Sequence, residues 1–308
     1  MRNLLAAEFH RIRRDPVSWI LAVAALLSGA CFGLLLADGR TDDVFILPLF
    51  VLLGVFISLS LGREFNDGTF RNKLIAGKTK TAVFLSKLLT GMAVSLVFTA
   101  AFLLPCAILA RSVLSWIPAE ALIWMVLGFF LLNLVWAVLF TLVSTQISAK
   151  GVAGLVNLAL VFALFFAAYE LEHVVRQPAE LPFETIVEVP MSPEEVAQAK
   201  AGSFTGMTSE KIDENGVVTY YKSVVIEDGS MPNPNYVQEP FNGLLRGLHS
   251  SLPSAQTHAY AHCLNMGFHQ SWETQELPRL KSYPLYSLAV ILLLSAMGLA
   301  AFRKKEIR

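Results

Sequence analysis

Six long stretches of this 308-residue chain consist almost entirely of apolar residues. They cover residues 17–37, 44–62, 82–110, 120–144, 151–171 and 284–302. A helix needs about 20 apolar residues to cross the hydrocarbon core of a bilayer, where it satisfies its own backbone hydrogen bonds. The pattern therefore predicts an all-α polytopic membrane protein with about six transmembrane helices. The composition agrees, because 16% of the residues are charged, against about 25% in soluble domains.

The remaining sequence divides around these stretches. Residues 1–16 mix apolar and charged positions, which predicts a cytoplasmic amphipathic helix lying on the membrane surface. Residues 17–171 hold five predicted transmembrane helices, and residues 284–308 hold the sixth and a basic cytoplasmic tail. Between them lie residues 172–283, and a structureless connection of that length is improbable. We therefore expect a small mixed α/β extracytoplasmic domain inserted before the last helix.

Local patterns predict the elements of this inserted segment. The sequence from Ser192 to Glu195 is a helix start with a capping serine, a proline and a glutamate, so a helix should run over about 193–200. Alternation and β-branched residues predict strands over 185–189, 217–221 and 223–226. A turn is expected at 214–216, and leucines on one face predict a further helix over 240–252.

Lysine and arginine are unevenly distributed among the connections. The N-terminal segment holds four, the second connection five and the C-terminus four, whereas the first and third connections hold one each, Arg40 and Arg111. Cytoplasmic flanks of membrane helices are enriched in basic residues. We therefore expect a plasma- or inner-membrane protein with both termini in the cytoplasm. Residues 172–283, with 14 acidic and 7 basic residues, would lie outside.

The connection between the second and third apolar stretches is the most informative part of the chain. Residues 63–81 are charged and too many for a simple turn. Asp67 or Thr69 can cap a short helix there, and Phe70 and Leu74, four residues apart, give this helix an apolar stripe. A short helix held at both ends can transmit the motion of a bound cytoplasmic protein to the membrane helices.

This connection resembles a segment of the ABC (ATP-binding-cassette) transporter permeases of the second exporter class. Those proteins carry a glutamate at the end of the second transmembrane helix, then a Gly-Thr pair and an arginine, and a lysine as the third helix begins. The matching residues here are Glu64, Gly68, Thr69, Arg71 and Lys87. The basic terminus at 301–306 is similar too, whereas residues 77–80 depart from the proline and arginine of many members.

The resemblance implies a permease subunit that exports an amphipathic substrate such as a peptide, a drug or a lipid-like molecule. ATP and Mg would be bound by two copies of a separate ABC ATPase subunit, and the permease would pair with a second copy or a related permease in membrane lipid. No nucleic acid is expected as a partner. The candidate ATPase-coupling residues are Glu64, Asp67, Gly68, Thr69, Phe70, Arg71, Lys73 and Leu74.

A few polar side chains fall within the apolar stretches. Asn133 and Asn157 lie deep in them, where an amide most often forms an interhelical hydrogen bond. If a translocation path exists, these two are the first candidates for its lining. Lys87 lies near the cytoplasmic end, and we expect its ammonium to snorkel to the surface.

Other chemistries are poorly represented. His258, His262, Cys263 and His269 are spaced to form a soft metal site, but no supporting carboxylate is evident, so no metal site is predicted. Gly77-Lys78-Thr79 lacks the upstream glycine of a phosphate-binding loop, since Asn72 stands there. No nucleophile and base pair lies at membrane depth, so we expect no catalytic residue and no cofactor on this chain. The alternative function is a membrane sensor or scaffold whose outer domain binds a ligand without transport.

Overall fold

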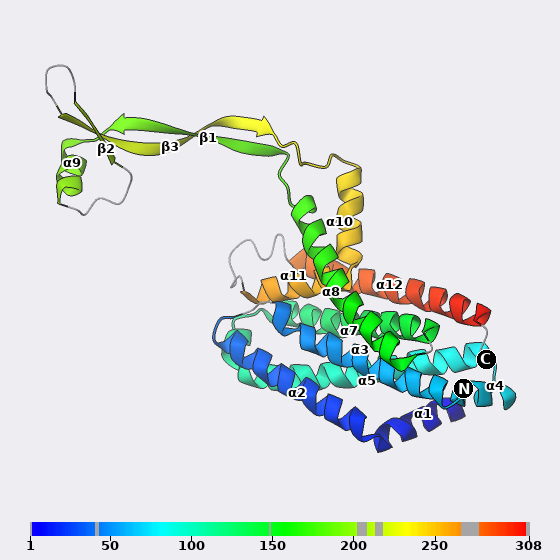
Figure 1. Ribbon diagram of the computed structural model, residues 1–308. Coiled ribbons are helices and arrows are strands. Elements are labelled where there is room, and N and C mark those ends of the chain that lie inside the picture. The colour runs from blue at the N-terminus through cyan, green and yellow to red at the C-terminus, as the bar shows by residue number, and fades with distance from the viewer. Residues whose placement is uncertain are drawn as a thin grey trace. The chain divides into compact units, whose positions relative to one another are not determined.

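The computed structural model describes residues 2–40, 43–147, 149–201, 208–212, 218–265 and 277–305. The chain forms two compact units. The first comprises Met1–Glu172 with Leu244–Arg308, and the second comprises His173–Gly243. Helices build the first unit, and a small sheet is the main feature of the second (Figure 1).

Six helices of the first unit are long and apolar enough to cross a membrane. They are α2 (Pro16–Ala37), α3 (Leu47–Asn66), α5 (Lys80–Leu109), α7 (Ala119–Gln146), α8 (Lys150–Val175) and α12 (Leu277–Lys304). Each corresponds to one predicted apolar stretch, although the second stretch starts with the 3-10 turn η1 (Asp43–Phe45) rather than with α3. The prediction of a multi-pass membrane protein with six transmembrane helices is confirmed.

Shorter helices flank the long ones. They are α1 (Arg2–Arg14), α4 (Thr69–Ile75), α6 (Arg111–Leu114), α10 (Phe241–Ser251) and α11 (Pro253–Asn265). Asp15 separates α1 from α2 and caps α2, because its carboxylate accepts a hydrogen bond from the Val17 amide at 3.4 Å. The two termini and α4 lie at the same end of the helical unit (Figure 1).

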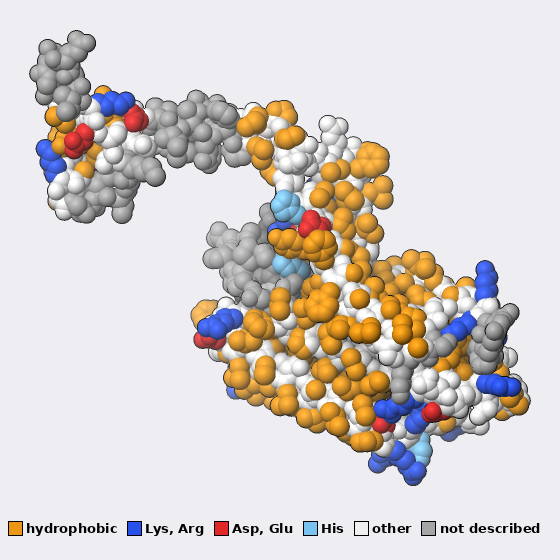
Figure 2. Space-filling view, viewed as in Figure 1, with side chains coloured by type: hydrophobic (Ala, Val, Ile, Leu, Met, Phe, Trp, Pro, Cys, Tyr) orange, Lys and Arg blue, Asp and Glu red, His pale blue; other side chains and the backbone are white. Residues whose placement is uncertain are grey.

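The long helices differ in how much of their surface is buried. Within the most apolar part of each, 56% is buried in α3 and α7, against 22–33% in the other four. Trp136 of α7 stacks on Phe50 of α3 at 5.1 Å between ring centroids, and both are completely buried. The outer helices expose leucine, isoleucine and valine, so apolar side chains cover much of the face seen in Figure 2. In a bilayer such a surface contacts lipid.

Two glycines let α2 approach α5 closely. A Cβ atom at Gly29 would lie 2.0 Å from the carbonyl oxygen of Phe102, and one at Gly33 would lie 2.8 Å from the Cα atom of Cys106. Pairs of small residues four apart are typical of tightly packed membrane helices, because they allow backbone-to-backbone contact. The α2–α5 pair therefore depends on the absence of side chains at these two positions.

The second unit contains an antiparallel sheet in the order β1-β3-β2. Its described strands are β1 (Glu180–Pro190), β2 (Thr208–Ile212) and β3 (Val218–Pro232). The helix α9 (Pro193–Lys200) begins with the predicted capping box, in which Ser192 and Glu195 exchange hydrogen bonds. The small strand-containing domain before the last helix is thus confirmed. The predicted turn at 214–216 lies outside the described residues.

Two predictions in this region change in detail. The strands expected over 217–221 and 223–226 are one continuous strand, β3. Lys222 does not interrupt it, because this residue pairs with Val189 of β1 and with Thr208 of β2 in the ladder. Its ammonium forms an ion pair with Glu195 of α9. The helix expected over 240–252 is α10, and α11 follows it directly at Pro253. The hydroxyl of Ser254 donates to the carbonyl of Leu164 at 2.7 Å, which fastens the start of α11 to α8.

Candidate functional site

The candidate site begins with the turn that joins α3 to α4. Gly68 adopts φ +63°, a left-handed conformation that glycine enters without strain. This turn lets α4 fold back beside the end of α3, and the Asn72 amide bonds the Gly68 carbonyl at 3.0 Å. The prediction that Asp67 or Thr69 caps the helix is wrong, because Gly68 is the cap residue and no side chain bonds the first amides. The helix α4 therefore starts from a left-handed glycine turn at Gly68 and not from a residue whose side chain caps its first amides.

Glu64, in the last turn of α3, is completely buried. Its carboxylate forms ion pairs with Lys87 of α5 and with Arg11 of α1. Lys73 of α4 lies 3.0 Å from its second oxygen. One carboxylate therefore contacts cations from three other helices.

Glu8 of α1 is the second carboxylate of this group and is 3% exposed. It pairs with Lys73 at 2.5 Å, with Arg11 at 3.0 Å, and also with Lys87. We call Glu8, Arg11, Glu64, Lys73 and Lys87 the ion cluster. It holds two carboxylates and three cations, and it joins α1, α3, α4 and α5.

The electrostatics of the ion cluster favour its charged form. Burial raises the pKa of the Glu8 carboxyl, but the nearby Lys87 ammonium and the hydrogen bonds from Lys73 and Lys87 outweigh it and lower the pKa to about 2. Breaking a buried ion pair by removing one partner typically costs about 3–5 kcal/mol, because a charge is left uncompensated. The cluster therefore makes the positions of four helix ends depend on one another.

An aromatic contact holds the other side of α4. Phe70 is 1% exposed, and its ring stacks on Phe65 at 4.3 Å and lies 5.8 Å from Phe302 at the end of α12. Leu74 also packs against the buried core, which confirms the predicted apolar stripe of Phe70 and Leu74. The Lys305 ammonium lies 4.2 Å from the Phe65 ring centroid. The last transmembrane helix is thus in direct contact with α4.

The opposite face of α4 makes no such contact with any residue that the structure describes. Arg71 and Asn72 are exposed, and Ile75, four residues after Arg71, is 74% exposed. An isoleucine side chain with that exposure beside an arginine is a suitable surface for a protein partner, because it combines an apolar anchor with a charge. Sequence reasoning selected Arg71 but missed Ile75, although the i, i+4 spacing of the two residues was visible.

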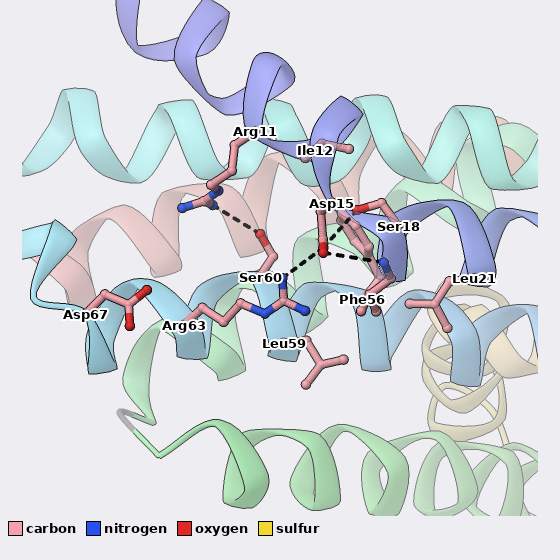
Figure 3. A pocket seen from close by; sticks show the side chains of 11 residues that line it. Arg11, Ile12, Asp15, Ser18, Leu21, Phe56, Leu59, Ser60, Arg63 and Asp67 are labelled. Atoms are coloured by element: carbon pink, nitrogen blue, oxygen red, sulfur yellow. Dashed lines mark hydrogen bonds and ion pairs between the residues drawn. The ribbon is translucent and has the colours of Figure 1, made fainter.

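A small cavity of about 70 Å³ adjoins the ion cluster between α1, α2 and α3. Figure 3 shows Arg11 and Arg63 on its walls, with Ser60 beside Arg11 and Asp15 beside Arg63. Asp15 pairs with Arg63 at 2.9 Å and accepts a hydrogen bond from the Ser18 hydroxyl at 3.2 Å. Partial burial raises the pKa of the Asp15 carboxyl, but the hydrogen bond and charge of Arg63 outweigh it and hold the pKa below its usual value. Asp67 also lines this cavity.

The residues selected from the sequence separate into three groups. Glu64 and Lys73 lie in the ion cluster, and Phe70 and Leu74 face the core. Gly68 forms the turn, and Thr69 begins α4. The exposed residues are Asp67 and Arg71. Among the selected residues of α4, Phe70, Lys73 and Leu74 therefore lie on its inward face, and Arg71 lies on its outward face.

Sequence reasoning missed part of the ion cluster. Glu8 and Arg11 were assigned only to an amphipathic surface helix, and Lys87 was expected to snorkel to the surface. That expectation is wrong, since Lys87 is 4% exposed and pairs with Glu64 and Glu8. A buried carboxylate needs a partner. The sequence offered one signal of this pairing, since Glu64 is a lone glutamate at the end of one apolar stretch and Lys87 is a lone lysine near the start of the next.

The two deep asparagines act in helix packing. Asn157 of α8 donates hydrogen bonds to the hydroxyls of Ser58 in α3 at 2.7 Å and Ser144 in α7 at 2.9 Å, as expected for an interhelical contact. Asn133 donates to the Phe129 carbonyl of its own helix at 2.9 Å. Neither lines the cavity beside the ion cluster.

The histidines contribute no metal site within the described part of the chain. There, no group of three or more His, Cys, Asp or Glu side chains could hold a metal ion. His258 instead lies 3.1 Å from the carboxylate of Glu172. His269 falls outside the described residues.

Comparison with known proteins adds no identification. No protein-family model matches the chain, and no curated protein matches it. The assignment of a function therefore depends on the residues and the geometry given above.

Proposed function

We propose that this multi-pass membrane protein is the permease subunit of an ATP-driven exporter of the ABC class, with α4 as its ATPase-coupling helix. In this proposal two copies of a separate ATPase subunit bind ATP and Mg. Two permease chains, identical or related, enclose the path of an amphipathic substrate such as a peptide, a drug or a lipid-like molecule.

One observation carries the proposal, namely the two faces of α4. Its inner face is fastened by Lys73 in the ion cluster and by Phe70 between Phe65 and Phe302. Its outer face exposes Arg71 and Ile75. A seven-residue helix with little stability of its own gains rigidity from these contacts, and rigidity is what a force-transmitting contact requires.

The contacts also define where a force on α4 is delivered. A displacement of Lys73 acts on Glu64 in α3 and on Glu8 in α1, and both carboxylates are bound to Lys87 in α5. A displacement of Phe70 acts on α12 through Phe302. Four other helices thus respond to motion of one short segment, and rigid-body movement of helices is the usual basis of alternating access in transporters.

The proposed orientation places α4 in the cytoplasm of a cell with the protein in its plasma or inner membrane. The basis is the excess of lysine and arginine at the end of the helical unit that carries the termini. ATP is available on this side, so an ATPase docked on α4 would have its substrate. The domain formed by His173–Gly243 would then lie on the exit side.

The decisive experiment measures ATPase stimulation by the assembled complex. The full chain, reconstituted in lipid nanodiscs, is combined with a candidate ABC ATPase subunit from the same cell. Arg71→Ala with Ile75→Ser should weaken binding at least tenfold, because it removes the charge and the apolar anchor of the exposed face. Glu64→Gln should leave the ATPase bound but reduce its stimulation, because that residue lies behind the docking face.

A matched control uses Arg40→Ala, which removes an exposed arginine from the connection between α2 and α3. This variant should bind and stimulate like the native chain. If Arg71→Ala with Ile75→Ser keeps full binding and stimulation, α4 is not the docking helix. If the native chain binds no ABC ATPase at all, the sensor or scaffold function replaces the exporter.

A further inference from the structure

The helix α1 packs against the bundle with one side only. On that side Glu8 belongs to the ion cluster and Ile12 packs against the buried core. The other side carries Arg2, Phe9 and Arg13, which are seven and eleven residues apart from the first and therefore share one face of a helix. All three are exposed, Phe9 to 44%. The contacts of α1 within the described part of the chain thus leave a second face uncovered.

The exposed charge on α1 is positive. Arg14 is exposed beside Arg13, and none of Arg2, Arg13 and Arg14 forms an ion pair with any residue that the structure describes. The one acidic residue of α1, Glu8, is buried. Figure 2 shows lysine or arginine side chains that protrude where α1 meets α2 in Figure 1. We call Arg2, Phe9, Arg13 and Arg14 the basic face. Three uncompensated cations on one helix favour an anionic partner.

The basic face adjoins the lipid-facing surface of α2. Asp15 alone separates the two helices, and its carboxylate is paired with Arg63. Trp19, in the first turn of α2, is 60% exposed, and its indole Nε1 donates a hydrogen bond to the Arg13 carbonyl at 2.9 Å. Ile20 beside it is 65% exposed. Tryptophan is enriched where hydrocarbon meets headgroups, because its ring is apolar and its N–H is polar. Arg13 therefore lies at the level of the headgroups.

A phospholipid with a net negative charge matches both the charge and the position of this face. A phosphate accepts two parallel hydrogen bonds from one guanidinium, which is the geometry that arginine favours. Phe9 lies along the face between Arg2 and Arg13, and its ring suits the apolar layer just below the headgroups. A zwitterionic headgroup also carries a cation, which the arginines repel. A protein docked here would have to displace lipid from Trp19, whereas a phospholipid contacts both surfaces at once.

We propose that the basic face of α1 binds anionic phospholipids of the leaflet that surrounds this end of the bundle, with the arginine side chains on the headgroup phosphates. The opposite side of α1 carries Glu8 and Arg11 of the ion cluster. A bound lipid therefore holds α1 against the bundle and supports the ion cluster from outside. The inference depends neither on an ATPase nor on the direction of transport.

The experiment is a native mass spectrometry titration of the full chain in detergent with phosphatidylglycerol and, separately, with phosphatidylcholine of the same acyl chains. The native chain should bind the first phosphatidylglycerol at least fivefold more tightly than the first phosphatidylcholine. Arg13→Gln with Arg14→Gln should weaken phosphatidylglycerol binding at least fivefold and remove most of the preference. One arginine near an anionic membrane surface contributes a factor of about five, or about 1 kcal/mol.

The matched control is Lys78→Gln with Lys304→Gln, which removes two exposed cations at the same end of the bundle outside α1. This variant should bind phosphatidylglycerol like the native chain, and thermal unfolding verifies that each variant is folded. Equal losses in the two double variants would show a general effect of net charge and overturn the site, as would a native chain that binds both lipids equally. If Arg13→Gln with Arg14→Gln keeps phosphatidylglycerol binding but binds the ATPase more weakly, the basic face contacts the ATPase instead.

Discussion

The ion cluster leads to a quantitative prediction about charge balance. In the native chain the three cations Arg11, Lys73 and Lys87 face the two carboxylates Glu8 and Glu64. Glu64→Gln leaves three cations with one carboxylate, whereas Lys87→Met leaves two cations with two carboxylates. The two substitutions remove members of the same ion pair but have opposite effects on the residual charge.

The difference in cost follows from burial. Removing one partner of a buried ion pair costs about 3–5 kcal/mol, and Glu64→Gln should reach that range because Lys87 stays 4% exposed with Glu8 as its one remaining carboxylate. Lys87→Met should cost less, about 1–3 kcal/mol, since Arg11 and Lys73 still satisfy both carboxylates. In the double variant Lys87 is replaced together with its partner, so no buried lysine is left short of a carboxylate. The total cost of the double variant should therefore be about 2 kcal/mol below the sum of the single costs.

The assay is equilibrium unfolding of the four proteins in one detergent at pH 7, followed by tryptophan fluorescence. Glu120→Gln is the control, because this residue pairs with Lys281 outside the cluster and is 59% exposed, and exposed pairs contribute about 0–1 kcal/mol. The reasoning is refuted if Glu64→Gln costs no more than Glu120→Gln, or if the costs of Glu64→Gln and Lys87→Met are additive.

Three further predictions concern the same end of the bundle and the α2–α5 contact. Gly68→Ala should destabilise the protein by about 1–2 kcal/mol in the same equilibrium unfolding assay, because φ is +63° there although a Cβ atom meets nothing within 4 Å. Gly151→Ala, at an open position of α8 with ordinary φ, should show no loss, and equal losses for the two variants would contradict this prediction. Because the pKa of Glu8 is lowered from 4.5 to about 2, its contribution to stability is fully present above pH 4.5 and is lost as the pH falls toward 2. The protection factors of the α1 amides, which correct hydrogen exchange for its intrinsic pH dependence, should therefore fall in that window in the native chain, and constant protection factors down to pH 2 would refute this. Gly29→Val should separate α2 from α5 and lower the melting temperature strongly, since even a Cβ atom lies 2.0 Å from the Phe102 carbonyl oxygen; wild-type melting would show that the helices can move apart at little cost.

The number and order of the transmembrane helices could be determined from the sequence, whereas some of their ends could not, since α12 begins at Leu277 rather than at 284 and α3 ends at Asn66 rather than at 62. Water is absent from the hydrocarbon, so any long apolar segment must satisfy its backbone internally, and this constraint is local. The same holds for α9, whose capping box at Ser192–Glu195 is encoded in four adjacent residues. The basic residue pattern also selected 63–81, where α4 and its turns lie.

The composition of the ion cluster was decided only by the tertiary structure. Glu8 and Lys87 are 79 positions apart in the sequence and occur on α1 and α5. Nothing local to α1 indicates burial, because its charged residues suit a helix on the membrane surface equally well. Glu8 becomes buried because α1 packs beside α5, and that packing depends on the shapes of several helices at once.

The same distinction applies to Gly68, Phe70 and Lys87. The sequence by itself determined that a short helix with an apolar stripe lies in the 63–81 connection, because helical spacing is a property of neighbouring residues. It did not determine that Gly68 forms the turn, since the cap was expected at Asp67 or Thr69. Only the tertiary structure decided that Phe70 contacts Phe302, 232 positions later, and that Lys87 is paired rather than exposed. The physical reason is that burial and ion pairing depend on which surfaces meet in space, and periodicity along the chain carries no information about the partner.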